Sequence, residues 1–262
     1  MNHLQNNMNT QLIWLFSLCL KETKRVIRIW KQTILPPIVT TTLYFLIFWN
    51  FIWSQIWSIH NIKYIDFLVP GFIMMSLITS SYSNVSSSFF GAKFQKYIEE
   101  IITSPLSKHS VIIWYISGWI LRWLLISIIV FLISMFFTDI NLKHPILALL
   151  FILFTSSLFS LAWFFNAFFA KSFDDINLIP TFIITPMVYL AWVFYPISSL
   201  SWIWSFLSHL NPIYYMVNWL RFSFLWFSEA NVYLSLIAIV FANILLYIWC
   251  YYLFKKWYWL KS

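Results

Sequence analysis

Few residues of this 262-residue chain could do chemistry, because only 9% are Asp, Glu, Lys or Arg. No acidic residue lies near the middle of an apolar segment, whereas ion-coupled carriers usually keep such an acid within the membrane. The sequence has no G-x-S-x-G or H-E-x-x-H motif, and its five histidines are too scattered for a metal site. These observations count against a secondary transporter and give no sign of an enzyme. A secondary transporter and an integral-membrane enzyme remain the two alternatives. An enzyme stays among them because a membrane enzyme can gather its residues from distant loops.

The glycines limit nucleotide binding. The chain has three, Gly71, Gly91 and Gly118, and none has the spacing of a P-loop or a dinucleotide-binding turn. Those loops need glycine so that the backbone can approach phosphate closely. We therefore expect no cofactor on this chain. Cys19 and Cys250 lie far apart in apolar surroundings, which argues against a disulfide.

A polar segment, 91–109 (GAKFQKYIEEIITSPLSKH), separates two long apolar runs. Apolar residues recur in it at helical spacing: Phe94, Tyr97, Ile98, Ile101 and Ile102. We expect a helix over 92–104 that ends at Ser104-Pro105, because the residue before proline disfavours helical geometry. The segment either packs on its own spans as a solvated hairpin or docks a soluble subunit. The residues alone leave both readings open.

The elements that position this segment must cross a membrane. The chain is 61% hydrophobic, which a soluble domain of this size could not bury. Lipid offers the backbone no hydrogen bonds, so long apolar runs are expected to be helices. We predict an all-α integral membrane protein, one domain over 1–262. Its six spans are 35–54, 67–90, 110–137, 146–169, 176–195 and 232–254, with Pro36 and Pro37 in the first turn of the first span.

Lysine and arginine orient these spans. Twelve of the sixteen lie on one side, against Lys63, Lys143 and Arg221 on the other. The positive-inside rule therefore places both termini and segment 91–109 in the cytoplasm. It also accounts for the net charge of +8, so we expect no nucleic-acid partner. Arg122 lies inside the third span, where it either snorkels toward the cytoplasmic surface or pairs with a neighbouring helix.

Two segments are expected not to span. Residues 11–34 form a basic amphipathic helix that lies in the cytoplasmic interface among membrane lipid, or a charged flank that only sets topology. Residues 196–229 are too long for a turn and too apolar for an open loop. We predict two short helices there, on or dipping into the outer leaflet as a re-entrant region. Asn211-Pro212 supplies the cap and first turn of the second one.

Polar residues within or beside the spans fall into two groups. The second span contains small polar residues that allow close helix packing or line a translocation path: Ser76, Thr79, Ser80, Ser83 and Asn84. Packing is the commoner explanation. At the start of the fifth span, Ser172-x-x-Asp175 resembles a capping box, and negative charge suits a helix N-terminus. Asp174 and Asp175 are therefore interpreted as structural.

Four patches of the sequence resemble one family, the ABC-2 type permeases, which are the membrane subunits of type V-like ABC exporters. They are 64–71 (YIDFLVPG), 91–105, 179–195 and 209–212 (HLNP), the last followed by Arg221. The resemblance covers essentially the whole chain and is strongest to bacterial inner-membrane permeases of this length. Family members often have a glycine pair near the end of the fifth span, where this chain has Ala191 and Trp192.

The resemblance implies a transport subunit without enzymatic activity of its own. Such permeases form a homodimer through the first, second and fifth spans and pass substrate along the second and fifth. A separate ATPase subunit, which binds ATP and Mg, docks on the interfacial helix and on the coupling helix at 92–104. Carried onto this chain, the docking residues are Lys93, Lys96, Glu99, Glu100, Arg25 and Arg28. Arg122, Asp174 and Asp175 are left with structural or coupling roles.

Overall fold

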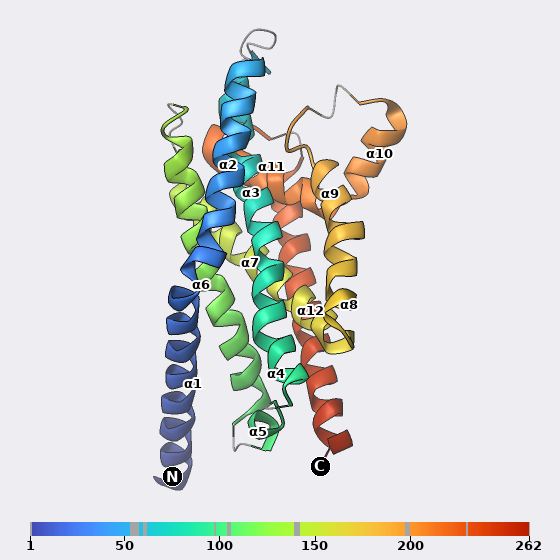
Figure 1. The fold of residues 1–262 in the computed structure, drawn as a ribbon. Helices are drawn as coiled ribbons and strands as arrows, with labels where there is room; N and C mark the ends of the chain where they lie inside the picture. Colours follow the sequence, from blue (N-terminus) through green and yellow to red (C-terminus); the bar gives the residue numbers. More distant parts are fainter. Residues whose placement is uncertain are drawn as a thin grey trace.

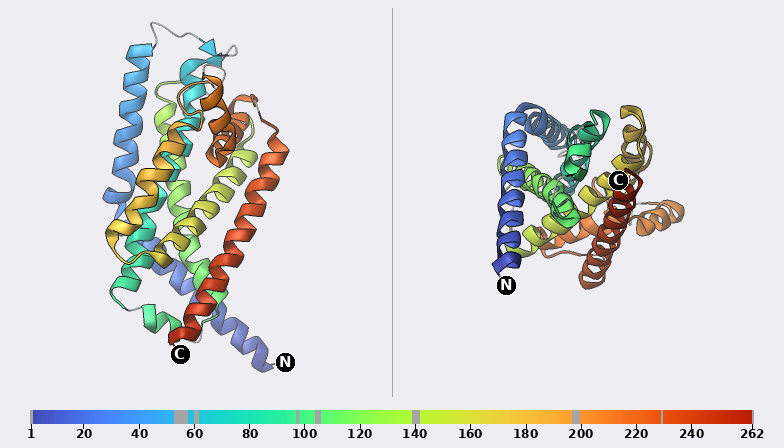
Figure 2. Two further views of the ribbon diagram at one scale, coloured as in Figure 1. Left: turned by 90° about the vertical axis from the view of Figure 1, so that its right-hand side faces the viewer. Right: turned by 90° about the horizontal axis from the view of Figure 1, so that it is seen from below.

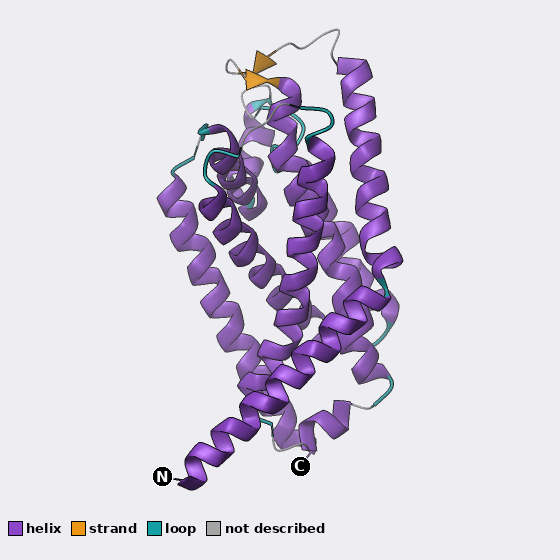
Figure 3. Ribbon diagram, turned by 90° about the vertical axis from the view of Figure 1, so that its left-hand side faces the viewer, coloured by secondary structure: helices purple, strands orange, loops and turns teal. Residues whose placement is uncertain are grey.

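The computed structural model describes residues 2–52, 58–59, 62–96, 98–103, 106–138, 142–196, 200–228 and 230–261. Nearly all of them form helices that lie side by side in one elongated bundle (Figure 1). Within these ranges the strands are β1 (Ser58–Ile59) and β2 (Ile62–Lys63), which pair antiparallel at one end of the bundle (Figure 3). The predicted all-α class is confirmed for the described residues.

Among the described residues, four helices are long and apolar enough to cross a membrane by length and composition. They lie in α2 (Trp30–Ile52), α6 (Lys108–Ser134), α7 (Pro145–Phe169) and α12 (Val232–Lys261). These are the first, third, fourth and sixth predicted spans. α3 (Tyr64–Val85) contains a shorter apolar helix, Tyr64–Ser80, and packs against α2, α6 and α7. The chain is therefore a multi-pass helical membrane protein.

The first two helices meet earlier than the sequence predicts. α1 (Asn2–Arg28) and α2 are separated at Ile29, where the chain bends (Figure 3), and not near residue 34. Pro36 and Pro37 consequently lie inside α2, so their placement in its opening turn was wrong. Hydroxyls supply hydrogen bonds near the prolines: Thr33 Oγ1 donates to the carbonyl of Ile29 (3.0 Å) and Thr40 Oγ1 to that of Pro36 (2.8 Å). Membrane helices tolerate proline on these terms.

The second and fifth predicted spans are both interrupted helices. α3 continues through a π-helical stretch, η1 (Ser86–Phe90), into α4 (Gly91–Phe94). The fifth span consists of α8 (Phe173–Ile179), π-helical η2 (Pro180–Ile184) and α9 (Thr185–Tyr189). Its predicted end at residue 195 was wrong, because the helix stops after Tyr189 and Trp192 adopts a left-handed backbone with φ of 63°.

The helix predicted over 92–104 is divided into α4 and α5 (Ile98–Thr103). Lys96 adopts φ of 63°, and a residue in this conformation cannot continue a right-handed helix. The expected single apolar stripe is therefore wrong: Phe94 on α4 is exposed, whereas Ile98 on α5 is buried. Tyr97 and the expected helix end at Ser104-Pro105 lie outside the described residues.

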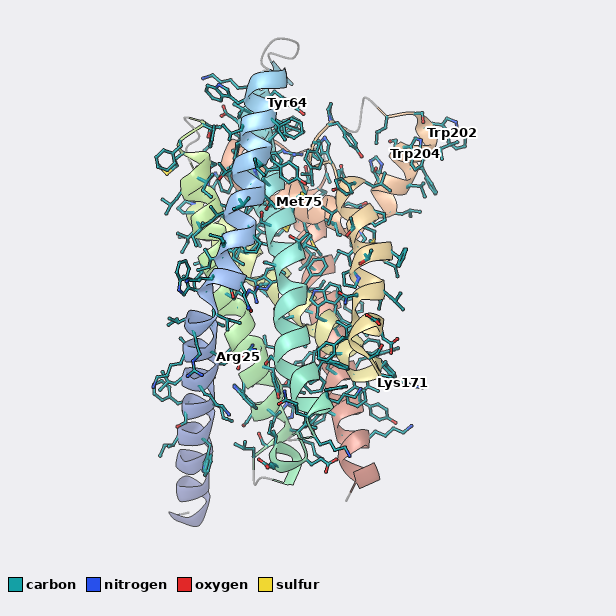
Figure 4. The ribbon with its side chains drawn as sticks, in the orientation of Figure 1. Arg25, Tyr64, Met75, Lys171, Trp202 and Trp204 are labelled. Atoms are coloured by element: carbon teal, nitrogen blue, oxygen red, sulfur yellow. The ribbon has the colours of Figure 1, made fainter. Side chains whose placement is uncertain are left out.

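The two ends of the bundle carry different elements. α4, α5 and both termini lie at one end, while the strands, α10 (Trp202–Leu210) and α11 (Pro212–Leu225) lie toward the other (Figures 1 and 2). Two helices, α10 and α11, lie within 196–229, where two short helices are expected. Asn211 caps α11 by accepting a hydrogen bond from the backbone of Ile213 (3.0 Å). α11 packs on α3 and α7 within the bundle, whereas Trp202 and Trp204 of α10 point outward (Figure 4).

Candidate functional site

Lys93 joins α4 to the turn between α7 and α8. Its ammonium Nζ donates to the carbonyl oxygens of Phe168 (2.6 Å), Ala170 (2.7 Å) and Ala167 (3.3 Å). The last carbonyls of a helix lack intrahelical partners and carry partial negative charge, so a cation there is favourable. Partial burial lowers the pKa of the Lys93 ammonium. The charge of this predicted docking residue is thus directed at the bundle itself.

An aromatic cluster reinforces the same connection. Phe173, the first residue of α8, lies edge-on to Phe90 with ring centroids 4.8 Å apart, and 5.3 Å from the ring of Phe94. Aromatic pairs at such spacings contribute beyond the area they bury. α4 therefore contacts α8 directly, as well as the end of α7 through Lys93.

α5 presents two exposed charges of the predicted docking set. Glu99 and Glu100 stand in its first turn, where negative charge stabilises a helix N-terminus, and both are exposed. Ile98 anchors the same turn in the core, and Lys96 is exposed just before it. Lys96, Glu99 and Glu100 form what we call the charged rim, at the end of the molecule that carries both termini.

α1 is held against α6 by a buried carboxylate that is not among the predicted site residues. Glu22, only 3% exposed, accepts hydrogen bonds from Arg25 Nη2 (2.5 Å) and Nε (3.0 Å) and from Ser88 Oγ (3.0 Å). Gly118 of α6 makes room for it, because a Cβ there would lie 2.1 Å from Glu22 Cγ. The spacing of Glu22 and Arg25, three residues apart on a helix, could have indicated the ion pair. The contact of Glu22 with Gly118 joins distant parts of the chain, so no local pattern indicates it.

A cavity of about 220 Å³ lies between α1 and α6 beside this ion pair. Its lining is rich in basic and aromatic side chains: Lys21, Glu22, Arg25, Arg28, Ser88, Trp114 and Tyr115. Arg25 of the predicted docking set is bonded to Glu22, whereas Arg28 is exposed. The six proposed docking residues therefore have different surroundings, and four of them are solvent-exposed: Arg28, Lys96, Glu99 and Glu100.

The capping box at the start of α8 is confirmed. Ser172 Oγ accepts a hydrogen bond from the backbone of Asp175 (3.1 Å), and Asp175 Oδ2 accepts from the backbones of Ser172 (3.0 Å) and Lys171 (2.9 Å). These backbone donors, Lys171 first, lower the pKa of the Asp175 carboxyl. Asp174 lies exposed in the same turn. The box fixes where the α8 helix begins, directly after the carbonyls that Lys93 binds.

A larger cavity, about 350 Å³, lies between α2, α3 and α6. It brings together three residues of the predicted path, Ser76, Thr79 and Ser80, with Arg122 of α6. Ser76 also shares a hydrogen bond with Thr41 of α2 (3.1 Å), so it serves helix packing as well. The side chains of Ser83 and Asn84 lie outside those that the structure describes. Arg122 is 3% exposed and lines the cavity.

At the opposite end, Arg221 of α11 is fully buried between two rings. Its guanidinium carbon lies 3.6 Å from the ring centre of Phe67 and 4.1 Å from that of Trp192. The guanidinium also donates to the carbonyls of Phe67 (3.3 Å) and Trp192 (2.9 Å). Trp192 thus takes a backbone conformation that favours glycine and uses its side chain to cover Arg221.

The helices and the charged rim together define the class of protein: a multi-pass helical membrane protein with a charged segment at one end. Comparison with known proteins identifies the family within this class. The family model described as "ABC-2 type transporter" matches residues 14–225. "Inner membrane transport permease YadH" of Escherichia coli K12 is 43% identical over 249 residues, 95% of this chain and 97% of that protein. The proteins of that name in Escherichia coli O157:H7 and Shigella flexneri match equally. The chain belongs to the ABC-2 type transporter family.

Proposed function

We propose that this chain is the membrane-spanning permease of an ATP-driven exporter in a bacterial inner membrane. It spans the bilayer six times, with both termini and the charged rim in the cytoplasm. A separate subunit binds ATP and Mg and hydrolyses the nucleotide. The proposal is supported by family membership, by the name of the 43% identical relative and by the bias of basic residues.

One contact carries the proposal in structural terms: the Lys93 ammonium on the last carbonyls of α7. An ATPase that binds the charged rim would move α5 and the neighbouring α4. Lys93 and the rings of Phe90 and Phe173 link α4 to the start of the fifth span. A displacement of the charged rim would therefore be transmitted through these contacts to the start of the fifth span. The rim itself is exposed, so a soluble partner could reach it.

The permease is proposed to work as a homodimer. Large apolar side chains are exposed along α2, for example Leu43 and Ile47, and along η2, for example Phe182 and Ile183. These are faces of the first and fifth predicted spans. Exposed apolar faces are covered by lipid or by another helix, and a second copy that packs there would place two large cavities near a shared interface.

Charge reversal on the rim tests the proposal. The permease is co-expressed with an ATP-binding subunit and purified through a tag on the permease. We expect the Glu99→Lys/Glu100→Lys variant to lose most of the bound ATPase, because a docking surface with reversed charge repels its partner. Lys63→Glu is the matched control, since Lys63 is exposed at the other end of the bundle. Unchanged co-purification and unchanged ATP hydrolysis in the double variant would argue decisively against docking through the rim.

A further inference from the structure

A row of basic residues on α1 lines the cavity of about 220 Å³ between α1 and α6. Lys21, Arg25 and Arg28 recur at helical spacing, so they share one face of α1. Arg25, labelled in Figure 4, is neutralised by its ion pair with Glu22. The side chains of Lys21 and Arg28 make no hydrogen bond or ion pair with any residue that the structure describes. The cavity wall therefore keeps two positive charges that no neighbouring carboxylate balances.

The one carboxylate among the residues that line this cavity is already engaged. Oε1 of Glu22 accepts hydrogen bonds from Arg25 and Ser88, so it does not serve Lys21 or Arg28. Like charges four residues apart, such as Lys21 and Arg25, destabilise a helix. An anion bound between the two unbalanced cations would offset this repulsion. The planar guanidinium of Arg28 suits phosphate, whose oxygens can accept two parallel hydrogen bonds from it.

Two aromatic residues of α6 form the other wall. Trp114 and Tyr115 line the cavity, with their ring centroids 4.4 Å apart. Trp114 is 4% exposed, and its indole Nε1 has no hydrogen-bond partner among the residues that the structure describes. A buried donor without an acceptor costs free energy, which an acceptor bound against this ring would offset. Trp and Tyr also favour the headgroup level of a bilayer.

The exposed surface of α1 places the cavity at that level. Phe16, Leu20 and Ile27 are exposed on a different face of the helix, where they form an apolar stripe. A helix with a basic face and an apolar stripe lies in the membrane interface, with the stripe among acyl chains and the basic face among headgroups. Figure 3 shows α1 inclined to the helices of the bundle. Basic pockets between membrane helices at this level bind lipid headgroups.

We propose that this cavity binds the phosphate headgroup of an anionic phospholipid, one for each permease chain. Lys21 and Arg28 hold the phosphate, Arg25 stays paired with Glu22, and the acyl chains extend into the surrounding bilayer. The inference goes beyond the proposed function, because it adds a bound lipid that joins α1 to α6. It also assigns Arg28 to lipid, which leaves the docking of an ATPase to the charged rim.

Native mass spectrometry of the full chain, purified in detergent, counts the lipid molecules that stay bound. The probe is dioctanoyl phosphatidylglycerol, and dioctanoyl phosphatidylcholine is the comparison lipid without net charge. We expect one phosphatidylglycerol per chain, bound at least about ten-fold more tightly than phosphatidylcholine, because two cations each favour an anionic head. The Lys21→Gln/Arg28→Gln variant should lose this preference.

Lys24→Gln/Lys31→Gln is the matched control, since it removes the same charge from two exposed positions nearby that do not line the cavity. All four residues are exposed, so both double variants should fold. The control should keep the preference for phosphatidylglycerol, and excess inorganic phosphate should displace little of the bound lipid.

Wild-type preference in the Lys21→Gln/Arg28→Gln variant would overturn the proposal. An equal loss in the control would also overturn it, since the lipid would then respond only to the overall charge of this region. Full displacement by inorganic phosphate would mean that the cavity takes free phosphate and not a lipid head. The assay contains no ATPase, so its failure is distinct from failure of the docking experiment.

Discussion

The ammonium of Lys93 lies 2.6 Å from the carbonyl oxygen of Phe168, which joins the segment after the second predicted span to the end of the fourth. Two further carbonyls, of Ala167 and Ala170, share the same ammonium. The residues that follow, Ser172 and Asp175, begin the interrupted fifth span with a capping box. These contacts connect the polar segment 91–109 to the fifth predicted span, which is proposed to line the transport path. The sequence alone shows only that this segment is charged.

Removing the Lys93 charge should reduce the coupling between the permease and ATP hydrolysis strongly, while lowering the stability of the fold only slightly. For Lys93→Met we expect a stability loss of about 1 kcal/mol, because hydrogen bonds to a partly exposed charge are worth less than buried ones. Stimulation of ATP hydrolysis by the permease, relative to the ATPase alone, should fall several-fold while the ATPase stays bound. Lys171→Met is the matched control, since Lys171 lies in the turn between α7 and α8 that Lys93 contacts and its side chain is exposed (Figure 4). Equal stimulation in both variants would show that the Lys93 contact does not transmit coupling.

Gly118 should tolerate no side chain while Glu22 is present. Gly118→Ala places a methyl 2.1 Å from Glu22 Cγ, so the Glu22 side chain or α1 itself must shift. Overpacking of this kind costs about 1–3 kcal/mol. Thermal unfolding should show the loss, and Glu22→Ala should be less harmful in the Gly118→Ala background than alone, which a double-mutant cycle measures. Ile128→Ala, exposed on the same helix, serves as the control. Strict additivity of the two changes would contradict the clash.

Trp192 should be replaced with less damage by glycine than by alanine, although glycine removes more atoms. The left-handed backbone at this position costs any residue with a Cβ about 1 kcal/mol relative to glycine. Both variants lose the buried ring over Arg221, so both should be destabilised by about 3–5 kcal/mol. We expect Trp192→Gly to be the more stable of the two in thermal unfolding. The reverse order would mean that the backbone is not held left-handed there.

The capping box should make stability sensitive to acid. The pKa of Asp175 lies below its ordinary value of 3.8, mainly because the backbone of Lys171 donates to the carboxylate. The folded state therefore gains stability from Asp175 above that value and loses it as the pH falls through the lowered pKa. Asp175→Asn should remove this part of the acid dependence in unfolding measured from pH 6 downward. Asp174→Asn, in the same turn but outside the box, should leave the dependence intact, and an effect as large as that of Asp175→Asn would refute the assignment.

Local signals in the sequence predicted local structure well. The apolar runs of α6 and α7 give helix boundaries within a few residues, and the capping box and Asn211-Pro212 are confirmed because their partners are three residues away or fewer. The left-handed residues Lys96 and Trp192 were not predictable, since neither residue type favours that conformation. The ring and the carbonyl of Trp192 both contact the buried Arg221, 29 residues further along the chain, and no local pattern shows that contact.

The candidate site was predictable in composition but not in arrangement. The polar segment 91–109 stands out by charge alone, yet the direction of Lys93 toward α7 depends on a contact over 74 residues or more. Similarly, the hydroxyls of the second span suggested packing or a path, and only the fold brings Thr79 together with Arg122. Contacts between distant helices depend on packing that a periodic pattern does not encode.

Photo-crosslinking tests most directly the central claim that a separate ATPase docks on the charged rim. A benzoylphenylalanine placed at Glu99 is irradiated in membranes that contain the permease and its ATP-binding subunit, beside the same probe placed at Lys63. The account predicts an adduct of permease and ATPase from position 99 and none from position 63. An adduct from position 63, or its absence at position 99 in a complex that still hydrolyses ATP, would contradict it.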